Sequence, residues 1–311
     1  MILSVSRRTD IPNYYGDWFY NRIKEGFVCV RNPMNFHQVS RIELSPEVVD
    51  CIVFWTKNPE PMMERLEELS PYPYYFQFTL TGYGKDIEPG VPHKKEKMIP
   101  VFQKLSEKIG KHRVIWRYDP VIFTGIYTPE YHLKAFEQIA GALNGYTHKC
   151  VISFGDVYAK NKKNMEVMGA YEADIPVLMD FSKKICEIAR ANGMTVGSCS
   201  EMIDLSVCGL SYNSCIDKAL IEEITGCKIK TSKDKNQRPE CGCVESIDIG
   251  TYDTCKNGCR YCYACDSRCN VIKNCGRYDA KAPLLCGVLT EEDKMTERKV
   301  KSLREEQISF F

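Results

Sequence analysis

The sequence has little histidine, no long apolar run and almost no net charge, and each absence argues against a class of protein. Only five histidines occur in 311 residues, none of them three or four residues from another, so a histidine-based metal centre is not expected. No run approaches the roughly 18 apolar residues of a membrane helix, and the opening segment is too short for a signal peptide. We therefore expect a cytoplasmic protein with no membrane partner. A net charge of +1 gives no general electrostatic reason to expect a nucleic-acid partner, although local basic patches leave one open.

Cysteine, by contrast, is abundant and unevenly distributed. The chain has 17 cysteines, and 13 of them lie between Cys199 and Cys286. In a long chain of a reducing compartment, clustered cysteines bind metal more often than they form disulfides. Such a density of thiols also fits an oxygen-poor setting, since exposed thiolates oxidise readily. These observations predict an iron–sulfur or other metal-binding protein.

The cysteines with the most specific spacing are Cys255, Cys259 and Cys262, which form a C-x3-C-x2-C triplet with Tyr261 before its last member. Three thiolates on one loop can hold three corners of a [4Fe-4S] cluster and leave the fourth iron free to bind a cofactor. This pattern resembles the signature of the radical S-adenosylmethionine (SAM) enzymes. The resemblance implies SAM chelated at the open iron, Tyr261 near its adenine, and an external electron donor such as a ferredoxin or flavodoxin.

A second interpretation uses an overlapping set of cysteines. Cys259, Cys262, Cys265 and Cys269 have the C-x2-C-x2-C-x3-C spacing of a bacterial ferredoxin, although Asn270 stands where proline is usual. It would make the chain an electron-transfer protein with a closed cluster and no SAM chemistry. We favour the open cluster, because the ferredoxin pattern leaves the first cysteine of the triplet and the aromatic residue unexplained.

Strand-like and helix-like segments alternate along most of the chain. Spacings of roughly 25 to 50 residues between the strands favour parallel βα units, and hence an α/β fold built as a partial or full (β/α) TIM-like barrel. Residues 1–227 are expected to form the barrel portion. The cysteine-rich region, 228–311, is expected to complete the barrel and end in a tail. The predicted strands cover residues 2–6, 51–55, 74–80, 113–118, 150–154, 194–198 and 246–252.

Loops that follow barrel strands carry the active site in this fold, and four polar residues in such loops are the candidate catalytic groups. They are Lys57, Arg117, Asp119 and Glu201.

The position of the cysteine triplet requires a permuted barrel. In the radical SAM family this loop follows the first strand, whereas here it lies about four-fifths of the way along the chain. If the strand before Cys255 lies beside the first strand, then Arg7, Arg8 and Asp10 adjoin the cluster. Asp10 would then accept the ammonium group of SAM, and either arginine would pair with its carboxylate.

The remaining cysteines suggest one or two additional sites, giving one to three clusters in all. One hypothesis is an iron–sulfur cluster or a structural zinc ion held by four thiolates, and another is a third cluster. The alternative for either set is that some thiols are simply small buried apolar groups. The second set is Cys199, Cys215, Cys241 and Cys243, and the third is Cys265, Cys269, Cys275 and Cys286.

The whole layout resembles a bacterial domain family of unknown function whose C-terminal cysteines are likened to the radical SAM cluster. That resemblance implies the class and the permuted order and says nothing about the substrate. Weak similarity of the strand-end loops to radical-type DNA photoproduct repair proteins leaves open a metal-stabilised nucleic-acid-binding or repair protein. The matching segments are 6–12, 54–59, 215–217, 237–238, 241–243, 248–255 and 261–264.

Overall fold

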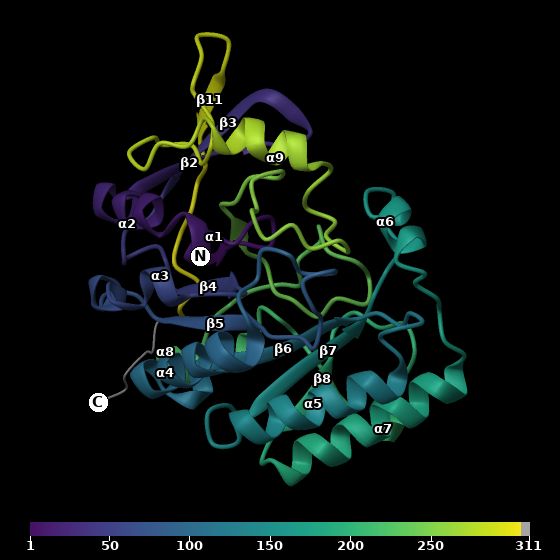
Figure 1. Cartoon of the computed structure of the whole chain (residues 1–311). Helices are drawn as coiled ribbons and strands as arrows, with labels where there is room; N and C mark the ends of the chain where they lie inside the picture. Colours follow the sequence, from purple (N-terminus) through teal and green to yellow (C-terminus); the bar gives the residue numbers. More distant parts are fainter. Residues whose placement is uncertain (306–311) are drawn as a thin grey trace, which may run out of the picture.

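A large parallel β-sheet organises the chain in the computed structural model, which describes residues 1–305 (Figure 1). Its eight strands have the order β10-β1-β4-β5-β6-β7-β8-β9, and every neighbouring pair is parallel. Within the described residues β9 and β10 are its two edges, so the sheet is open and compatible with a partial barrel. The strands are β1 (Ile2–Val5), β4 (Cys51–Thr56), β5 (Tyr74–Thr79), β6 (Val114–Val121), β7 (Lys149–Phe154), β8 (Thr195–Ser198), β9 (Ser211–Tyr212) and β10 (Ile247–Asp248).

The strand that precedes the cysteine triplet lies beside the first strand, as the permuted order requires. Leu3 pairs with Ile247, and Ser4 pairs with Asp248. The Asp248 carboxylate also accepts hydrogen bonds from the hydroxyl groups of Ser4 and Ser6, at 2.9 and 2.6 Å. Parallel strands end at the same edge of a sheet, so the loop after β10 and the loop after β1 adjoin each other.

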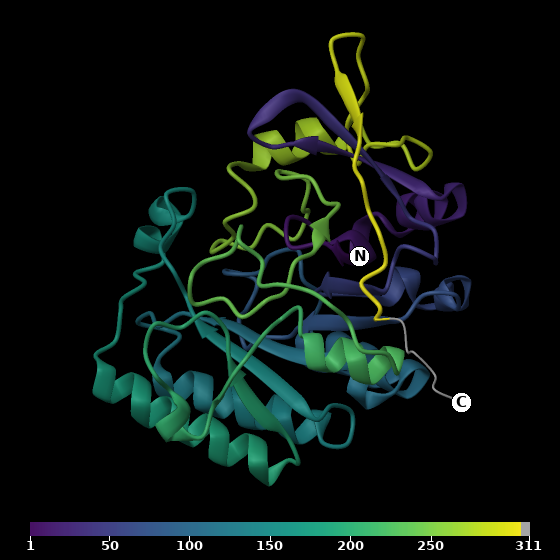
Figure 2. The same ribbon diagram turned by 180° about the vertical axis from the view of Figure 1, so that it is seen from behind.

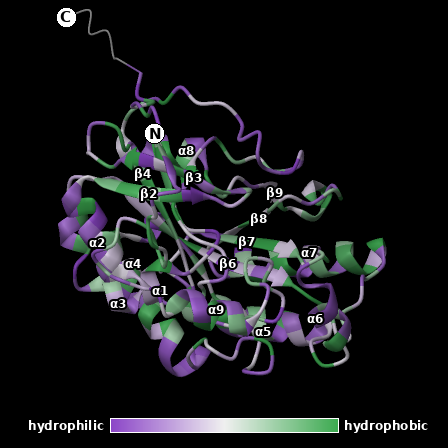
Figure 3. Ribbon diagram, turned by 90° about the horizontal axis from the view of Figure 1, so that it is seen from above, coloured by the Kyte–Doolittle hydropathy of each residue, from purple (hydrophilic) through white to green (hydrophobic). Residues whose placement is uncertain are grey.

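Long helices cover one face of the sheet, and together they bury the main hydrophobic core (Figure 1). The helix termini follow local sequence signals: Thr128 caps the α5 helix by accepting from the amide of Tyr131, and Gly26 ends α2 with φ +74°. Figure 3 shows β7 largely in the colour of hydrophobic residues, whereas α7 mixes both colours, as expected for a helix with one buried side. These helices are α2 (Gly16–Glu25), α4 (Ile99–Ile109), α5 (Pro129–Leu143) and α7 (Ile175–Ala191).

The other face of the sheet is covered by the α8 helix (Lys218–Thr225) and by irregular segments that follow β9 and precede β10 (Figure 2). Val53, Tyr75 and Ile115 point to this side and pack with residues such as Ile221 in a second hydrophobic cluster. Cys215, Cys241 and Cys243 belong to the same cluster. Residues 229–244 therefore contribute to the packing against this face of the sheet.

A smaller sheet, which was not predicted, lies at one end of the molecule next to the α9 helix (Arg268–Cys275) (Figure 1). It consists of the hairpin β2 (Phe27–Asn32) and β3 (Asn35–Glu43), with β11 (Lys294–Glu297) parallel to β3.

No helix in the described part of the chain is long and apolar enough to span a bilayer. Short helices complete the fold: α1 (Ile11–Tyr14), α3 (Glu60–Met63), η1 (Leu66–Leu69), η2 (Lys94–Met98), η3 (Lys111–Arg113), α6 (Lys162–Val167) and η4 (Ser206–Cys208).

One strand boundary differs from the prediction in a way that matters for the candidate site. Asp119 was expected in a loop, yet β6 continues to Val121 with a register shift after Tyr118. Pro120 has no amide hydrogen to donate, so it interrupts the ladder without ending the strand, which pairs again at Val121 and Phe154. Asp119 therefore lies within β6, near the carboxyl-terminal end of that strand.

Candidate metal centre

The cysteine triplet lies at the carboxyl-terminal edge of the sheet, directly after β10. Cys255, Cys259 and Cys262 are partly buried, and they are free thiols like every other cysteine of the chain. Burial raises the pKa of the Cys259 thiol to about 12 and also raises the pKa of Cys255. A metal that binds these residues must therefore displace protons from neutral thiols.

Hydrogen bonds to neighbouring loops fix the backbone of the triplet. The Asn257 side chain donates to Asp10 at 3.0 Å and accepts from the Tyr14 hydroxyl at 2.8 Å. The Gly90 amide, in the loop after β5, donates to the carbonyl of Asn257 at 2.8 Å. A side chain at Gly90 would place its Cβ only 2.6 Å from that carbonyl oxygen, so the close contact of the two loops requires glycine.

Asp10 joins three loops and has little capacity left for a ligand. Its carboxylate accepts from Thr56 Oγ1 at 2.7 Å, Lys57 N at 2.9 Å, Asn257 Nδ2 at 3.0 Å and Asn13 N at 3.2 Å. A carboxylate offers about four acceptor sites, and these donors use them. Burial raises the pKa of Asp10, while the hydrogen bonds oppose that effect. The geometry therefore shows Asp10 joining the loops around the triplet, and its expected contact with the SAM ammonium group stays a prediction.

The two arginines after β1 point to different places. Arg8 donates to the carbonyl of Gly250 at 3.3 Å and stacks over Tyr252, with 5.1 Å between the guanidinium carbon and the ring centre. Arg7 instead donates to Ser246 at 3.3 Å and lies over Trp55 at 5.4 Å. Arg8 therefore faces the segment before Cys255, whereas the carbonyl of Arg7 accepts from the Tyr263 hydroxyl, directly after Cys262, at 3.3 Å.

A buried charge network that the sequence did not reveal lies beside the triplet. Glu88 accepts from the Lys57 ammonium group at 2.7 Å, from Thr81 at 3.0 Å, and also from Lys94 and the Tyr261 hydroxyl. Burial acts to raise the pKa of Glu88, but the two ammonium groups outweigh it and lower the value to about 2. Glu88 is therefore ionised, and it holds Lys57 and Tyr261 in fixed positions next to Cys259.

The predicted second set of thiols comes together. The sulfur atoms of Cys199 and Cys215 lie 3.1 Å apart. Cys243 is within hydrogen-bonding contact of both Cys215 and Cys241, so the four side chains form one continuous group. Arg117 donates to the sulfur of Cys215 at 2.7 Å.

Arg117 also links this thiol group to the predicted catalytic residues. Its guanidinium group binds both carboxylate oxygens of Asp119, with Nε 2.9 Å from Oδ1, and Ser153 donates to the same carboxylate at 3.2 Å. Glu201 accepts from the amide of Phe154 at 2.8 Å, and burial raises its pKa to about 7. These groups converge at the ends of β6, β7 and β8.

The predicted third set is divided among different surroundings. Cys265 lies in hydrogen-bonding contact with Cys262. Cys275 and Cys286 both contact the Tyr15 hydroxyl, Cys275 at 3.2 Å, whereas Cys269 is exposed on α9. The structure therefore does not gather these four thiols around one point.

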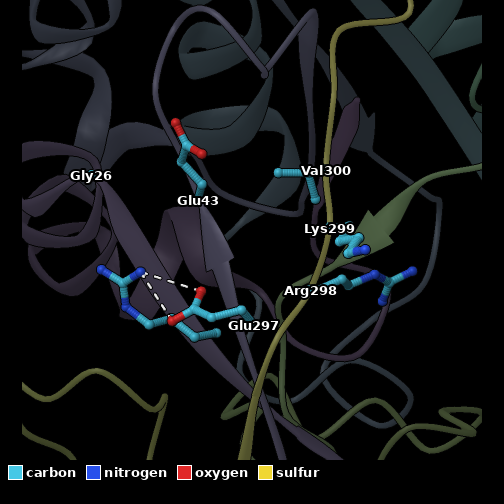
Figure 4. Close-up of a pocket in the computed structure, with 7 residues that line it drawn as sticks. Gly26, Glu43, Glu297, Arg298, Lys299 and Val300 are labelled. Atoms are coloured by element: carbon cyan, nitrogen blue, oxygen red, sulfur yellow. Dashed lines mark hydrogen bonds and ion pairs between the residues drawn. The ribbon is translucent and has the colours of Figure 1, made fainter.

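As the side chains stand, no group of three or more His, Cys, Asp or Glu residues between positions 1 and 305 could hold a metal ion. The triplet and the second set nevertheless supply free, neighbouring thiols, which are suitable donors for iron–sulfur clusters or zinc. A surface cavity of about 630 Å³ lies instead beside the small sheet, where Arg41 and Glu297 form an ion pair at 3.4 Å (Figure 4). None of the predicted site residues lines it.

The fold and the candidate site define a cysteine-rich α/β protein whose conspicuous polar groups gather at one edge of an open parallel sheet. The chain belongs to the family described as Domain of unknown function (DUF1848), whose model matches residues 2–264. A comparison with curated proteins finds no match. The family match includes the triplet and the second set of thiols, and it ends before Cys265.

Proposed function

We propose that this chain is a radical SAM-type iron–sulfur enzyme. The observation that carries the proposal is the position of Cys255, Cys259 and Cys262 beside the end of β1, at the edge where polar groups from neighbouring strands converge. This is the edge at which parallel α/β sheets bind their ligands. A C-x3-C-x2-C loop there would place an open iron next to the substrate site.

When bound, a cluster with one open iron supplies the electron that cleaves SAM and so starts radical chemistry on the substrate. The chain would hold that cluster through the three thiolates of the triplet. Asn257 and Gly90 fix the path of the loop, and Glu88 orients Tyr261 beside it.

The substrate would be positioned by side chains from the neighbouring strands. Lys57, held by Glu88, lies next to the triplet and is one cationic contact. The paired groups of Arg117 and Asp119 offer a donor and an acceptor at the end of β6. Glu201, with a pKa of about 7, could exchange a proton with the substrate near neutral pH.

Electron paramagnetic resonance (EPR) of the anaerobically reconstituted, reduced protein tests this proposal. We expect a cluster signal that shifts when SAM is added and is lost in Cys255→Ala. Cys227→Ala, which removes a thiol that belongs to none of the predicted sets, is the matched control and should retain both the signal and the shift. A signal that is indifferent to SAM and to Cys255→Ala would overturn the proposal.

One contact favours a second candidate, an electron-transfer protein with a closed cluster. Cys265 lies beside Cys262, and its sulfur is 3.8 Å from the carbonyl of Cys255, so a fourth thiol is close to the triplet. A fourth thiolate would close the open iron and prevent SAM chelation. If the cluster is closed, the EPR signal of the wild type should not respond to SAM, and Cys265→Ala should make it respond. If the cluster is open, the wild-type signal should already respond to SAM.

A further inference from the structure

A four-thiol group lies where the sheet fails to close, and it points to a second metal site independent of the proposed radical chemistry. We propose that four cysteines form a mononuclear site for a zinc-class divalent cation, which joins the two free edges of the sheet. They are Cys199, Cys215, Cys241 and Cys243.

The four cysteines come from both sides of the opening. Cys199 directly follows β8, and Cys215 follows the edge strand β9. Cys241 and Cys243 instead precede β10, the opposite edge strand. In the described chain β9 and β10 do not pair with each other. One ion bound by all four cysteines would therefore link the two edges of the sheet.

The spacing of the sulfur atoms favours one ion over a cluster. Tetrahedral zinc with bonds of about 2.3 Å places its sulfur ligands roughly 3.8 Å apart. Cys199 and Cys215 already have their sulfur atoms 3.1 Å apart, and Cys241 and Cys243 belong to the same buried cluster. Binding of one ion would require the four side chains to rotate toward a common point. A cubane cluster binds each thiolate through a separate iron and would need wider separations.

The surroundings supply hydrogen-bond donors and positive charge. The Ile216 amide lies 3.3 Å from the Cys243 sulfur, and Asn213 Nδ2 lies 3.6 Å from the Cys215 sulfur. Four thiolates around a divalent cation leave a net charge of about −2. Arg117 contacts Cys215, and half-buried Arg7 lies close enough to Cys215 and Cys243 to interact with them electrostatically. Because Arg117 is also paired with Asp119, the two guanidinium groups offset that charge in part.

The segment around Cys215 and the segment that contains Cys241 and Cys243 are already hydrogen-bonded to each other. Ser214 donates to the carbonyl of Gly242 at 2.8 Å, and the Val244 amide donates to Ile216 at 3.2 Å. A side chain at Gly242 would place its Cβ 2.5 Å from the Ser214 oxygen and 2.7 Å from a ring carbon of Tyr212. The glycine of the C-x-C sequence therefore permits this segment to lie against the loop after β9.

Cobalt(II) titration of a full-length variant that lacks the triplet tests the proposal separately from the proposed function. Cys255→Ser, Cys259→Ser and Cys262→Ser would be combined, and the metal-free protein would be titrated anaerobically. We expect about one equivalent of cobalt with the intense visible bands of tetrahedral thiolate coordination, and displacement by zinc. Adding Cys215→Ser should abolish the four-sulfur spectrum, whereas Cys227→Ser, a control at the end of α8, should leave it unchanged.

Two results would overturn the site: no cobalt band in the triplet variant, or a band that persists when Cys215→Ser is added. Iron and acid-labile sulfide that are lost with Cys215→Ser would instead identify a cluster and would also refute a mononuclear ion. If the substituted variants fail to fold, X-ray absorption spectroscopy of the zinc-loaded wild type tests the proposed coordination instead. A zinc shell of four sulfur atoms at about 2.3 Å is expected, and a shell of nitrogen or oxygen atoms would refute the proposal.

Discussion

Replacing Glu88 with glutamine would leave the ammonium groups of Lys57 and Lys94 without their shared, buried counter-charge. The side chain of Glu88 is only 1% exposed, so solvent screens these interactions little. The lowering of its pKa from an ordinary 4.5 to about 2 corresponds to a contribution of about 3 kcal/mol to stability. This agrees with the roughly 3–5 kcal/mol lost when one partner of a buried ion pair is removed. We expect Glu88→Gln to lower the free energy of unfolding by about 3 kcal/mol at neutral pH.

Urea denaturation of both proteins, in the same metal-loading state and over a pH series, measures this loss. The folded pKa of Glu88 lies below its unfolded value, so its contribution is fully present above about pH 4.5 and disappears as pH falls toward 2. The difference between wild type and Glu88→Gln should therefore shrink on acidification. Glu60→Gln is the matched control, because Glu60 pairs with Lys97 at the surface and should change stability by less than about 1 kcal/mol.

Two results would refute this reasoning about Glu88. One is a loss smaller than about 1 kcal/mol at neutral pH, which would mean that the ammonium groups find water or other partners. The other is a loss that stays constant down to about pH 3, which would mean that the carboxylate charge is not its source.

The remaining predictions concern the loops around the two thiol groups. Gly90→Ala should separate the loop after β5 from Asn257, lowering stability by about 1–3 kcal/mol and reducing iron content after reconstitution; normal iron content would contradict the proposed fit. Asp10→Asn should destabilise the protein by about 1–3 kcal/mol in urea denaturation, because it disrupts hydrogen bonds that join three loops, and unchanged stability would contradict that joining role. Chelation of the zinc-class ion should speed hydrogen exchange at the Ile216 and Val244 amides while sparing β5 and β6; equal rates with and without chelator would argue against a metal link between the edges.

Features that depend on neighbouring residues could be predicted from the sequence. The alternation of strands and helices reflects periodicity and backbone preferences that act within a few residues. The unpredicted small sheet joins β2 and β3 to β11, which lies some 250 residues later, so local patterns carry no sign of its third strand. The candidate function remains a prediction, because the family match identifies a domain and no activity.

The sequence by itself determined which thiols are available and how the triplet is spaced, because both are properties of the covalent chain. Only the tertiary structure decided which distant groups meet. It placed β10 beside β1, gathered Cys199, Cys215 and Cys243 at the open edges, and gave the side chains of Arg7 and Arg8 different partners. It also enclosed Glu88 between two lysines. These tertiary contacts depend on the packing of helices and loops against both faces of the sheet. That packing brings together side chains that are far apart in the chain.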